Sequence, residues 1–190
     1  MRDCLMKDIH LYIIGHARHG KDTVGKILSR DYKLDPCDSS WFMAEMTVFP
    51  ALKHKYGYNT VLDCYTDRFN HRREWFKLIE DANPFGYEIS VELFKKHRVY
   101  TGMRSARELN AVREHPDLNP FVVWVDASRR LPPESPESMT VSKLDADYII
   151  DNNGEPSLLH PQIATLMSVV LPQFACELKR KSVPNMVGEV

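Results

Sequence analysis

A short apolar run followed by a loop that begins and ends in glycine constrains this chain more than any other feature. Leu11 to Ile14 form an uninterrupted apolar stretch, which is typical of a strand buried on both faces of a parallel sheet. The residues that follow have helical spacing from about 23 to 30. A strand, a glycine-bounded loop and a helix in this order predict a backbone cradle for phosphate groups, where the alternative is a chance glycine turn.

The loop itself predicts a nucleotide site. Glycines let the backbone curl so that successive N–H groups point inward. Lys21 is expected to reach the β- and γ-phosphates as a catalytic charge, and the Thr23 hydroxyl is expected to hold Mg²⁺. Asp22 departs from the usual pattern, because it stands directly after the lysine and places the hydroxyl one position later. The predicted ATP contacts are Gly15, His16, Ala17, Arg18, His19, Gly20, Lys21, Asp22 and Thr23.

The three basic side chains inside the loop leave two interpretations open. His16, Arg18 and His19 could add positive charge near the phosphates, or they could be loop residues that face solvent.

Strand and helix patterns alternate along the rest of the chain. Apolar or β-branched runs predict further strands at residues 32–37, 99–102, 121–125 and 148–150. Helical spacing predicts helices at 23–30, 41–54, 61–81, 89–96, 105–114 and 156–170, with Ser39 or Ser40 capping the second. This alternation predicts an α/β fold, a doubly wound parallel sheet with flanking helices. We expect one domain over residues 1–178 and a flexible tail over 179–190.

Bulk composition narrows the class of protein. The 190 residues carry a net charge of −1, which argues against a positive field over the whole molecule but leaves a local basic patch open. The four cysteines have no C-x-x-C spacing, so we expect no zinc site and a reducing compartment. No apolar run near the N-terminus is long enough to span a membrane, so we expect a soluble, cytoplasmic protein.

Two further residues are predicted catalytic groups. Asp38 follows the presumed second strand, and ligands of doubly wound sheets gather outside the carboxyl ends of the strands. A carboxylate there can accept the proton of an acceptor hydroxyl, although Asp38 could instead cap the next helix. Arg104 comes after the third strand and could clamp a phosphate, or it could be a surface residue at a helix start.

A basic and aromatic segment at residues 68–77 is the candidate acceptor site. If the segment is one helix, Arg68, Arg72 and Trp75 share one face, as do Phe69 and Arg73 or Phe76. Arginines on such a face could bind phosphate while Trp75 or Phe76 stacks on a base. The alternative is an amphipathic helix whose aromatic side chains are core and whose arginines are solvated.

The segment after the fourth strand offers weaker candidates. Asp126 could be a Mg²⁺ carboxylate at the strand end, or it could cap the next turn with Ser128. Arg129 and Arg130 could flank the nucleotide as parts of a mobile lid, because the proline-rich stretch behind them predicts an irregular surface loop.

Two segments resemble the phage-type deoxynucleoside monophosphate kinases, within the larger nucleoside-monophosphate and dephospho-coenzyme-A kinase group. They are the loop ending Gly20-Lys21-Asp22-Thr23 and the late segment from Ala146 to Gly154, which resembles the last strand and turn of that group near the adenine. Residues from about 39 to 101 do not match the free-nucleotide enzymes. The Gly102-Met103-Arg104-Ser105 stretch replaces their usual motif after the third strand.

The divergent middle leaves the acceptor open. In size and in its divergent acceptor region, the chain is similar to phage kinases that phosphorylate 5-hydroxymethyluracil within DNA, which implies ATP and Mg²⁺ as cofactors and a host cytoplasmic location. This acceptor is the leading interpretation. The alternatives are a free deoxynucleoside monophosphate kinase and a nucleotide-binding module without an acceptor.

Overall fold

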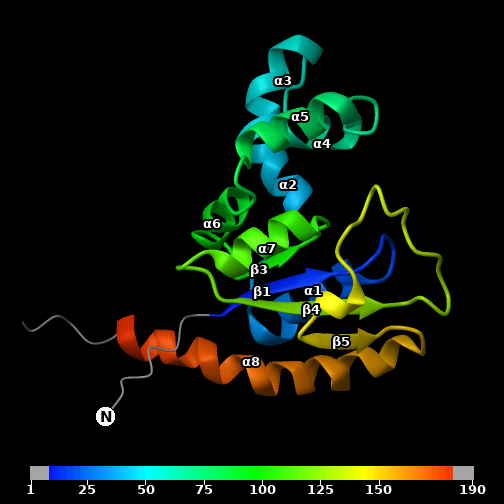
Figure 1. The fold of residues 1–190 in the computed structure, drawn as a ribbon, viewed down its shortest axis with the longest axis vertical. Coiled ribbons are helices and arrows are strands. Elements are labelled where there is room, and N and C mark those ends of the chain that lie inside the picture. The colour runs from blue at the N-terminus through cyan, green and yellow to red at the C-terminus, as the bar shows by residue number, and fades with distance from the viewer. Residues whose placement is uncertain (1–8, 182–190) are drawn as a thin grey trace, which may run out of the picture.

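The computed structural model describes residues 9–181, and its centre is a five-stranded parallel sheet. The strand order is β2-β3-β1-β4-β5, so the strand that leads into the glycine-bounded loop lies in the middle (Figure 1). The strands are β1 (His10–Ile14), β2 (Pro36–Asp38), β3 (Val99–Thr101), β4 (Pro120–Asp126) and β5 (Tyr148–Asp151). The predicted doubly wound α/β fold is confirmed by this topology.

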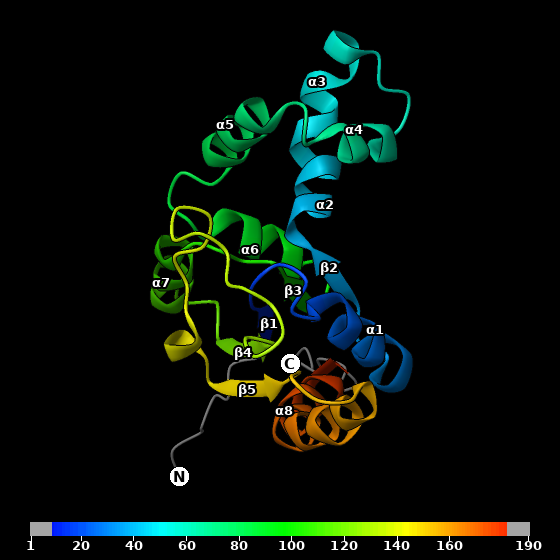
Figure 2. The ribbon, with the colours of Figure 1, turned by 90° about the vertical axis from the view of Figure 1, so that its right-hand side faces the viewer.

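Helices cover both faces of the sheet. One layer consists of α1 (Lys21–Tyr32) and α8 (Leu159–Lys181), and the other of α6 (Glu88–Phe94) and α7 (Ala106–Glu114). Short 3-10 turns, η2 (Lys143–Asp145) and η3 (Pro156–Leu158), flank β5. Figures 1 and 2 both show α8 on one side of the sheet and the α6–α7 pair on the other.

The two layers are held by alternate residues of the same strands. Leu11 and Ile13 of β1 pack in the cluster that faces α1 and α8. Tyr12 and Ile14 pack in the cluster that faces α6 and α7. All four side chains are fully buried, as the apolar run predicted for a strand covered on both faces.

A helical arm projects from the edge of the sheet. It consists of α2 (Ser39–Met43), a π-helical turn η1 (Ala44–Val48), α3 (Phe49–Tyr56), α4 (Val61–Asp67) and α5 (Arg72–Ala82). Figure 2 shows α2 rising beyond β2, with α3, α4 and α5 carried away from the sheet. The arm has a small apolar cluster of its own, made by Ala44, Val48, Leu52, Cys64 and Trp75.

The structure corrects several predicted boundaries. The helix expected at 61–81 is two helices, because residues 68–71 form a turn between α4 and α5. The helix expected at 41–54 widens into η1 midway. Strand β2 begins only at Pro36, since α1 extends through Tyr32. Pro36 is tolerated as the first residue of an edge strand.

The C-terminal helix is also longer than expected. It runs through Pro172 and includes residues 179–181 of the predicted tail, while residues 182–190 lie outside the described residues. None of the helices described between residues 9 and 181 combines the length and the apolar composition that a membrane span requires.

Candidate phosphate site and acceptor face

The glycine-bounded loop curls between the end of β1 and the start of α1. Gly20, at the helix start, has a φ of +103°, which favours glycine, and an added Cβ would overlap the Asn152 side chain. That amide donates a hydrogen bond to the His19 carbonyl at 2.8 Å. The end of β5 therefore fixes the shape of the loop from behind.

His19 is a structural part of the loop. Its side chain is fully buried, and its Nδ1 accepts a hydrogen bond from the Ala127 N–H at 3.1 Å. The interpretation that His19 faces solvent is therefore wrong, because the ring ties the loop to the end of β4. Arg18, by contrast, is exposed with a φ of 64°.

His16 lies partly buried beside His19 and Trp124, with both ring-to-ring distances at 5.2 Å. Burial and the neighbouring His19 lower the pKa of His16, so its ring favours the neutral form. Its Nδ1 accepts a hydrogen bond from the Glu134 N–H at 3.1 Å.

Lys21 folds back over the loop that carries it. Its ammonium donates to the Gly15 carbonyl at 2.7 Å and to the His16 carbonyl at 2.9 Å. Burial is the main cause that lowers the pKa of Lys21, and the positive charge of Arg104 lowers it further. The ammonium is thus held against the backbone of the loop by two carbonyl groups.

Asp22 and Thr23 lie exposed in the first turn of α1, directly after Lys21. Mg²⁺ prefers oxygen ligands and uses few protein groups, because water and substrate phosphates complete its shell. A carboxylate and a hydroxyl at this turn fit that requirement. The described residues contain no group of three or more His, Cys, Asp or Glu side chains that could hold a metal without substrate.

Glu134 is a residue of this site that the sequence did not single out. It belongs to the proline-rich loop after β4, and its carboxylate accepts a hydrogen bond from the Ala17 N–H at 2.6 Å. The same carboxylate forms an ion pair with Arg104. Burial alone would raise the pKa of Glu134, but the hydrogen bonds from Arg104 and Ala17 outweigh it and keep the pKa below its ordinary value.

Asp38 and Arg104 both lie near Lys21 at the carboxyl edge of the sheet. The charges of both residues act on the Lys21 ammonium. Gly102, which has a φ of +98°, lets β3 end close to Asp38, since an added Cβ would lie 3.3 Å from the Asp38 Oδ2. Both residues therefore lie near the loop, and their catalytic roles stay predictions.

Asp38 also caps α2. Its Oδ1 accepts a hydrogen bond from the Trp41 N–H at 3.0 Å, so the cap is Asp38 rather than Ser39 or Ser40. This bond uses one carboxylate oxygen, and the capping and catalytic interpretations are therefore compatible.

Tyr65 and Arg68 extend the site towards the arm. Burial and the nearby charge of Asp38 raise the pKa of Tyr65, and its ring makes an edge contact with Trp41 at 5.2 Å. The Arg68 guanidinium lies 4.0 Å from the Tyr65 ring centre and donates to the Tyr65 carbonyl at 2.7 Å. Arg68 is thus linked to Asp38 through Tyr65, which sequence reasoning did not identify.

The other predicted acceptor residues lie farther along the arm. Arg72 and Arg73 begin α5, and they line an open hollow of about 320 Å³ together with Tyr56, Phe69, Asn70, His71 and Glu74. Arg68 is not part of that helix, so the predicted shared face of Arg68, Arg72 and Trp75 is wrong.

Trp75 requires a second correction. Its side chain is 5% exposed and packs in the apolar cluster of the arm, so its ring has no open face for a base. The exposed aromatic rings of this region are those of its neighbour Phe76 and of Phe69.

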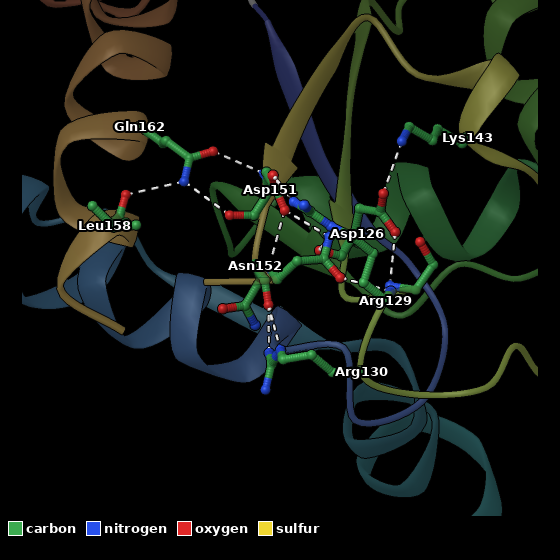
Figure 3. Close-up of polar contacts among 10 residues, drawn as sticks. Asp126, Arg129, Arg130, Lys143, Asp151, Asn152, Leu158 and Gln162 are labelled. Atoms are coloured by element: carbon green, nitrogen blue, oxygen red, sulfur yellow. Dashed lines mark hydrogen bonds and ion pairs between the residues drawn. The ribbon is translucent and has the colours of Figure 1, made fainter. Parts of the chain in front are cut away.

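The residues after β4 form a polar cluster with the end of β5 (Figure 3). Asp126 accepts hydrogen bonds from Lys143 at 2.8 Å and from the Ser128 N–H at 3.0 Å. These bonds outweigh its burial, which by itself raises the pKa, and lower the pKa of Asp126 to about 2. Asp126 therefore caps the turn with Ser128, one of its two predicted roles.

Arg129 and Arg130 fasten the start of the proline-rich loop to β5. Arg129 forms an ion pair with Asp151 at 2.7 Å, and Arg130 donates to the Asn152 carbonyl (Figure 3). Both guanidinium groups are thus engaged in anchoring the loop.

Comparison with known structures finds P-loop kinases at low sequence identity. No protein-family model and no curated protein sequence matches the chain. Shikimate kinase from Aquifex aeolicus is 19% identical with a TM-score of 0.49, covering 85% of this chain and 98% of that one. Shikimate kinase from Bacteroides thetaiotaomicron is 12% identical with a TM-score of 0.48, covering 86% and 98%.

A sugar kinase from Janibacter sp. is 12% identical with a TM-score of 0.48, covering 88% of this chain and 98% of that one. At this level of similarity, the neighbours do not assign an activity or a substrate. The P-loop α/β fold rests on the sheet order and the loop geometry described above.

Proposed function

We propose that this protein is a P-loop kinase that transfers the γ-phosphoryl group of ATP to a deoxynucleotide acceptor. The observation that carries the proposal is the convergence of Lys21, Arg104 and Asp38 from three separate segments on one glycine-bounded loop. Phosphoryl transfer needs positive charge around the transferring group and an oriented nucleophile. These three side chains have the chemistry for both tasks.

In the proposed reaction each group has one task. Backbone N–H groups of the cradle and the Lys21 ammonium bind the β- and γ-phosphates, and Arg104 stabilises charge on the transferring oxygens. The second Asp38 oxygen orients an acceptor hydroxyl and accepts its proton. Thr23 and Asp22 would hold Mg²⁺, which neutralises phosphate charge when it is bound with ATP.

The leading acceptor is the 5-hydroxymethyl group of 5-hydroxymethyluracil in DNA. Support comes from the arm, where Arg68 adjoins Tyr65 near Asp38, and where Arg72 and Arg73 lie beside exposed aromatic rings. Positive groups bind backbone phosphates, and exposed rings can stack on a displaced base. Because Trp75 is buried, this role passes to Phe69 or Phe76.

The second candidate acceptor is a free deoxynucleoside monophosphate. The contact between Tyr65 and Trp41, with Arg68 stacked on Tyr65, favours it, because aromatic rings and a positive charge near Asp38 have the chemistry to bind one base and one phosphate. In that case a phosphate oxygen of the acceptor attacks the γ-phosphorus, and no hydroxyl proton has to be removed.

One labelling experiment tests both acceptors. Incubation with γ-labelled ATP and Mg²⁺ is set up in parallel with hydroxymethyluracil DNA, ordinary DNA and each free deoxynucleoside monophosphate. Label in the modified DNA alone supports the leading acceptor, and label in a free nucleoside diphosphate supports the second. Absence of transfer to every acceptor, with ATP bound, would favour a nucleotide-binding module.

Lys21→Ala should abolish this transfer while the thermal melt stays close to that of the unaltered protein. Lys26→Ala is the matched control, because Lys26 is exposed on the same helix. Near-normal transfer by a folded Lys21→Ala variant would contradict the proposed role of the cradle.

A further inference from the structure

A carboxylate lies in the place where the cradle would hold a phosphate. One Glu134 oxygen accepts the Ala17 N–H of the loop at 2.6 Å, and the other pairs with the Arg104 guanidinium. The Glu134 N–H in turn donates to the His16 ring at 3.1 Å. Two of these contacts therefore involve groups that the proposed reaction assigns to nucleotide phosphates, and the third joins the proline-rich loop to His16.

This set of partners is the set that an anionic oxygen of ATP requires. Backbone N–H groups before a helix start and an arginine fork bind carboxylate and phosphate oxygens alike. We infer that Glu134 is an internal phosphate substitute, which closes the cradle without nucleotide and must leave before the phosphates of ATP can bind. This inference rests on the proposed function, because it concerns the same ATP site.

The loop around Glu134 has the anchors that such a movement requires. At the start of the loop, Arg130 donates a hydrogen bond to the Asn152 carbonyl. At the end of the loop, the Thr140 N–H donates a hydrogen bond to the Arg104 carbonyl at 2.9 Å. Between these anchors, most residues from 132 to 138 are exposed, and three of them are prolines without an N–H. Loss of the Glu134 contacts would therefore free the middle of the loop and leave both ends in place.

Displacement of Glu134 would also release Arg104. In the closed arrangement the Arg104 guanidinium is paired with Glu134 rather than open to a substrate. The γ-phosphate of ATP brings negative charge to the same place and repels the carboxylate. Arg104 then leaves the Glu134 carboxylate and binds the γ-phosphate instead. Its guanidinium is therefore available to the transferring group only when a nucleotide is present.

The closed state should reduce the apparent affinity for nucleotide. If about 90% of the molecules are closed, the apparent dissociation constant is about tenfold higher than that of the open state. Glu134→Gln keeps the size of the side chain and removes its charge, so it should lower the dissociation constant for ATP about tenfold. Inorganic pyrophosphate should show the same gain, because the competition concerns phosphate oxygens.

Calorimetric titration with ATP and with pyrophosphate, both with Mg²⁺, tests the inference. The variants are Glu134→Gln, Glu134→Ala and the control Glu137→Gln, whose side chain is exposed on the same loop. We expect tighter binding by both Glu134 variants and unchanged binding by the control. Unchanged or weaker binding by folded Glu134 variants, beside a wild type that binds ATP, would overturn the inference and leave the proposed function standing.

Hydrogen exchange gives an independent readout. The amides between the two anchors, in residues 134–138, should exchange faster when ATP is added to the wild type, and equally fast in Glu134→Gln without ATP. Slower exchange of these amides on ATP binding would show that Glu134 stays in place, and would overturn the inference. Failure of the wild type and all variants to bind ATP would refute the proposed function and the inference together.

Discussion

Glu108 gives the sharpest quantitative test of the structure. It lies in the first turn of α7 with 9% of its surface exposed, and it accepts a hydrogen bond from the Tyr100 hydroxyl at 2.8 Å. Burial disfavours the charged carboxylate, and the single hydrogen bond from Tyr100 compensates only in part. The pKa of Glu108 is therefore raised from an ordinary 4.5 to about 7.

The sign of the pH dependence follows from this shift. The folded state binds the Glu108 proton more tightly than the unfolded state does. The stabilising contribution of the neutral carboxyl is full below about pH 4.5, and it is lost as the pH rises through about 7. The difference between a pKa of 4.5 and one of about 7 corresponds to roughly 3–4 kcal/mol of unfolding free energy.

Glu108→Gln should remove this dependence, because an amide resembles the neutral carboxyl and can still accept from Tyr100. Denaturant unfolding of both proteins between pH 4 and pH 8 measures the difference in free energy of unfolding. We expect that difference to grow by about 3 kcal/mol in favour of the variant as the pH rises.

Glu114→Gln, at the exposed far end of the same helix, is the control and should show no such growth. A difference between wild type and Glu108→Gln that stays constant with pH would refute the reasoning. It would mean that Glu108 is hydrated or charged in the folded protein.

Three further variants test the site and the arm. Asp38→Asn should lower the maximal rate of transfer to a hydroxyl acceptor by roughly 10²–10⁴-fold with little change in ATP affinity, and a melt that falls while turnover persists would leave only the cap. Thr23→Ala should raise the Mg²⁺ concentration needed for half-maximal rate, and an unchanged requirement would assign the ion to other groups such as Asp22. Trp75→Ala should destabilise the protein by about 3–5 kcal/mol in denaturant unfolding, whereas Phe76→Ala should change stability by less than about 0.5 kcal/mol. Equal effects at Trp75 and Phe76 would contradict the packing of the arm.

The sheet and the phosphate cradle were predictable because their signals are local. A strand that is buried on both faces must be apolar throughout, and the glycines of the loop after it indicate a backbone conformation that other residues rarely adopt. Asp38 and Arg104 were predictable for a related reason. Strand ends in a parallel sheet share one edge, so residues that follow two such strands meet although they are distant in sequence.

The arm was harder to predict. The turn at residues 68–71 contains neither glycine nor proline, and it is formed by a hydrogen bond from the Asn70 N–H to the Asp67 carbonyl at 2.9 Å. A backbone hydrogen bond of this kind does not change the spacing of apolar residues, so the sequence predicts one helix over residues 61–81. Because α5 starts anew after this turn, the spacing of residues 61–67 does not indicate which side of α5 is buried. The sequence therefore does not show whether Trp75 or its neighbour Phe76 is the buried aromatic residue.

Glu134 lay beyond sequence reasoning for another reason. Its partner Ala17 is 117 residues away, and nothing near Glu134 distinguishes it from Glu137 on the same exposed loop. Only the path of the loop over the cradle separates the two glutamates. A contact of this kind depends on the completed fold and has no local signal.

The widened turn η1 bears on how the arm tolerates changes in chain length. A π-helical turn bonds residue i to i+5, so it absorbs one residue more than an α-helical turn does. Deletion of one residue within 44–48 can be taken up by tightening to α geometry, with the direction of α3 preserved. The same deletion at Pro50 or Ala51 of α3 would rotate all later residues by about 100° and separate Leu52 from its cluster. Single-residue differences in length among related chains are therefore expected to concentrate in this turn, because the outer helices of the arm then keep their orientation relative to the sheet.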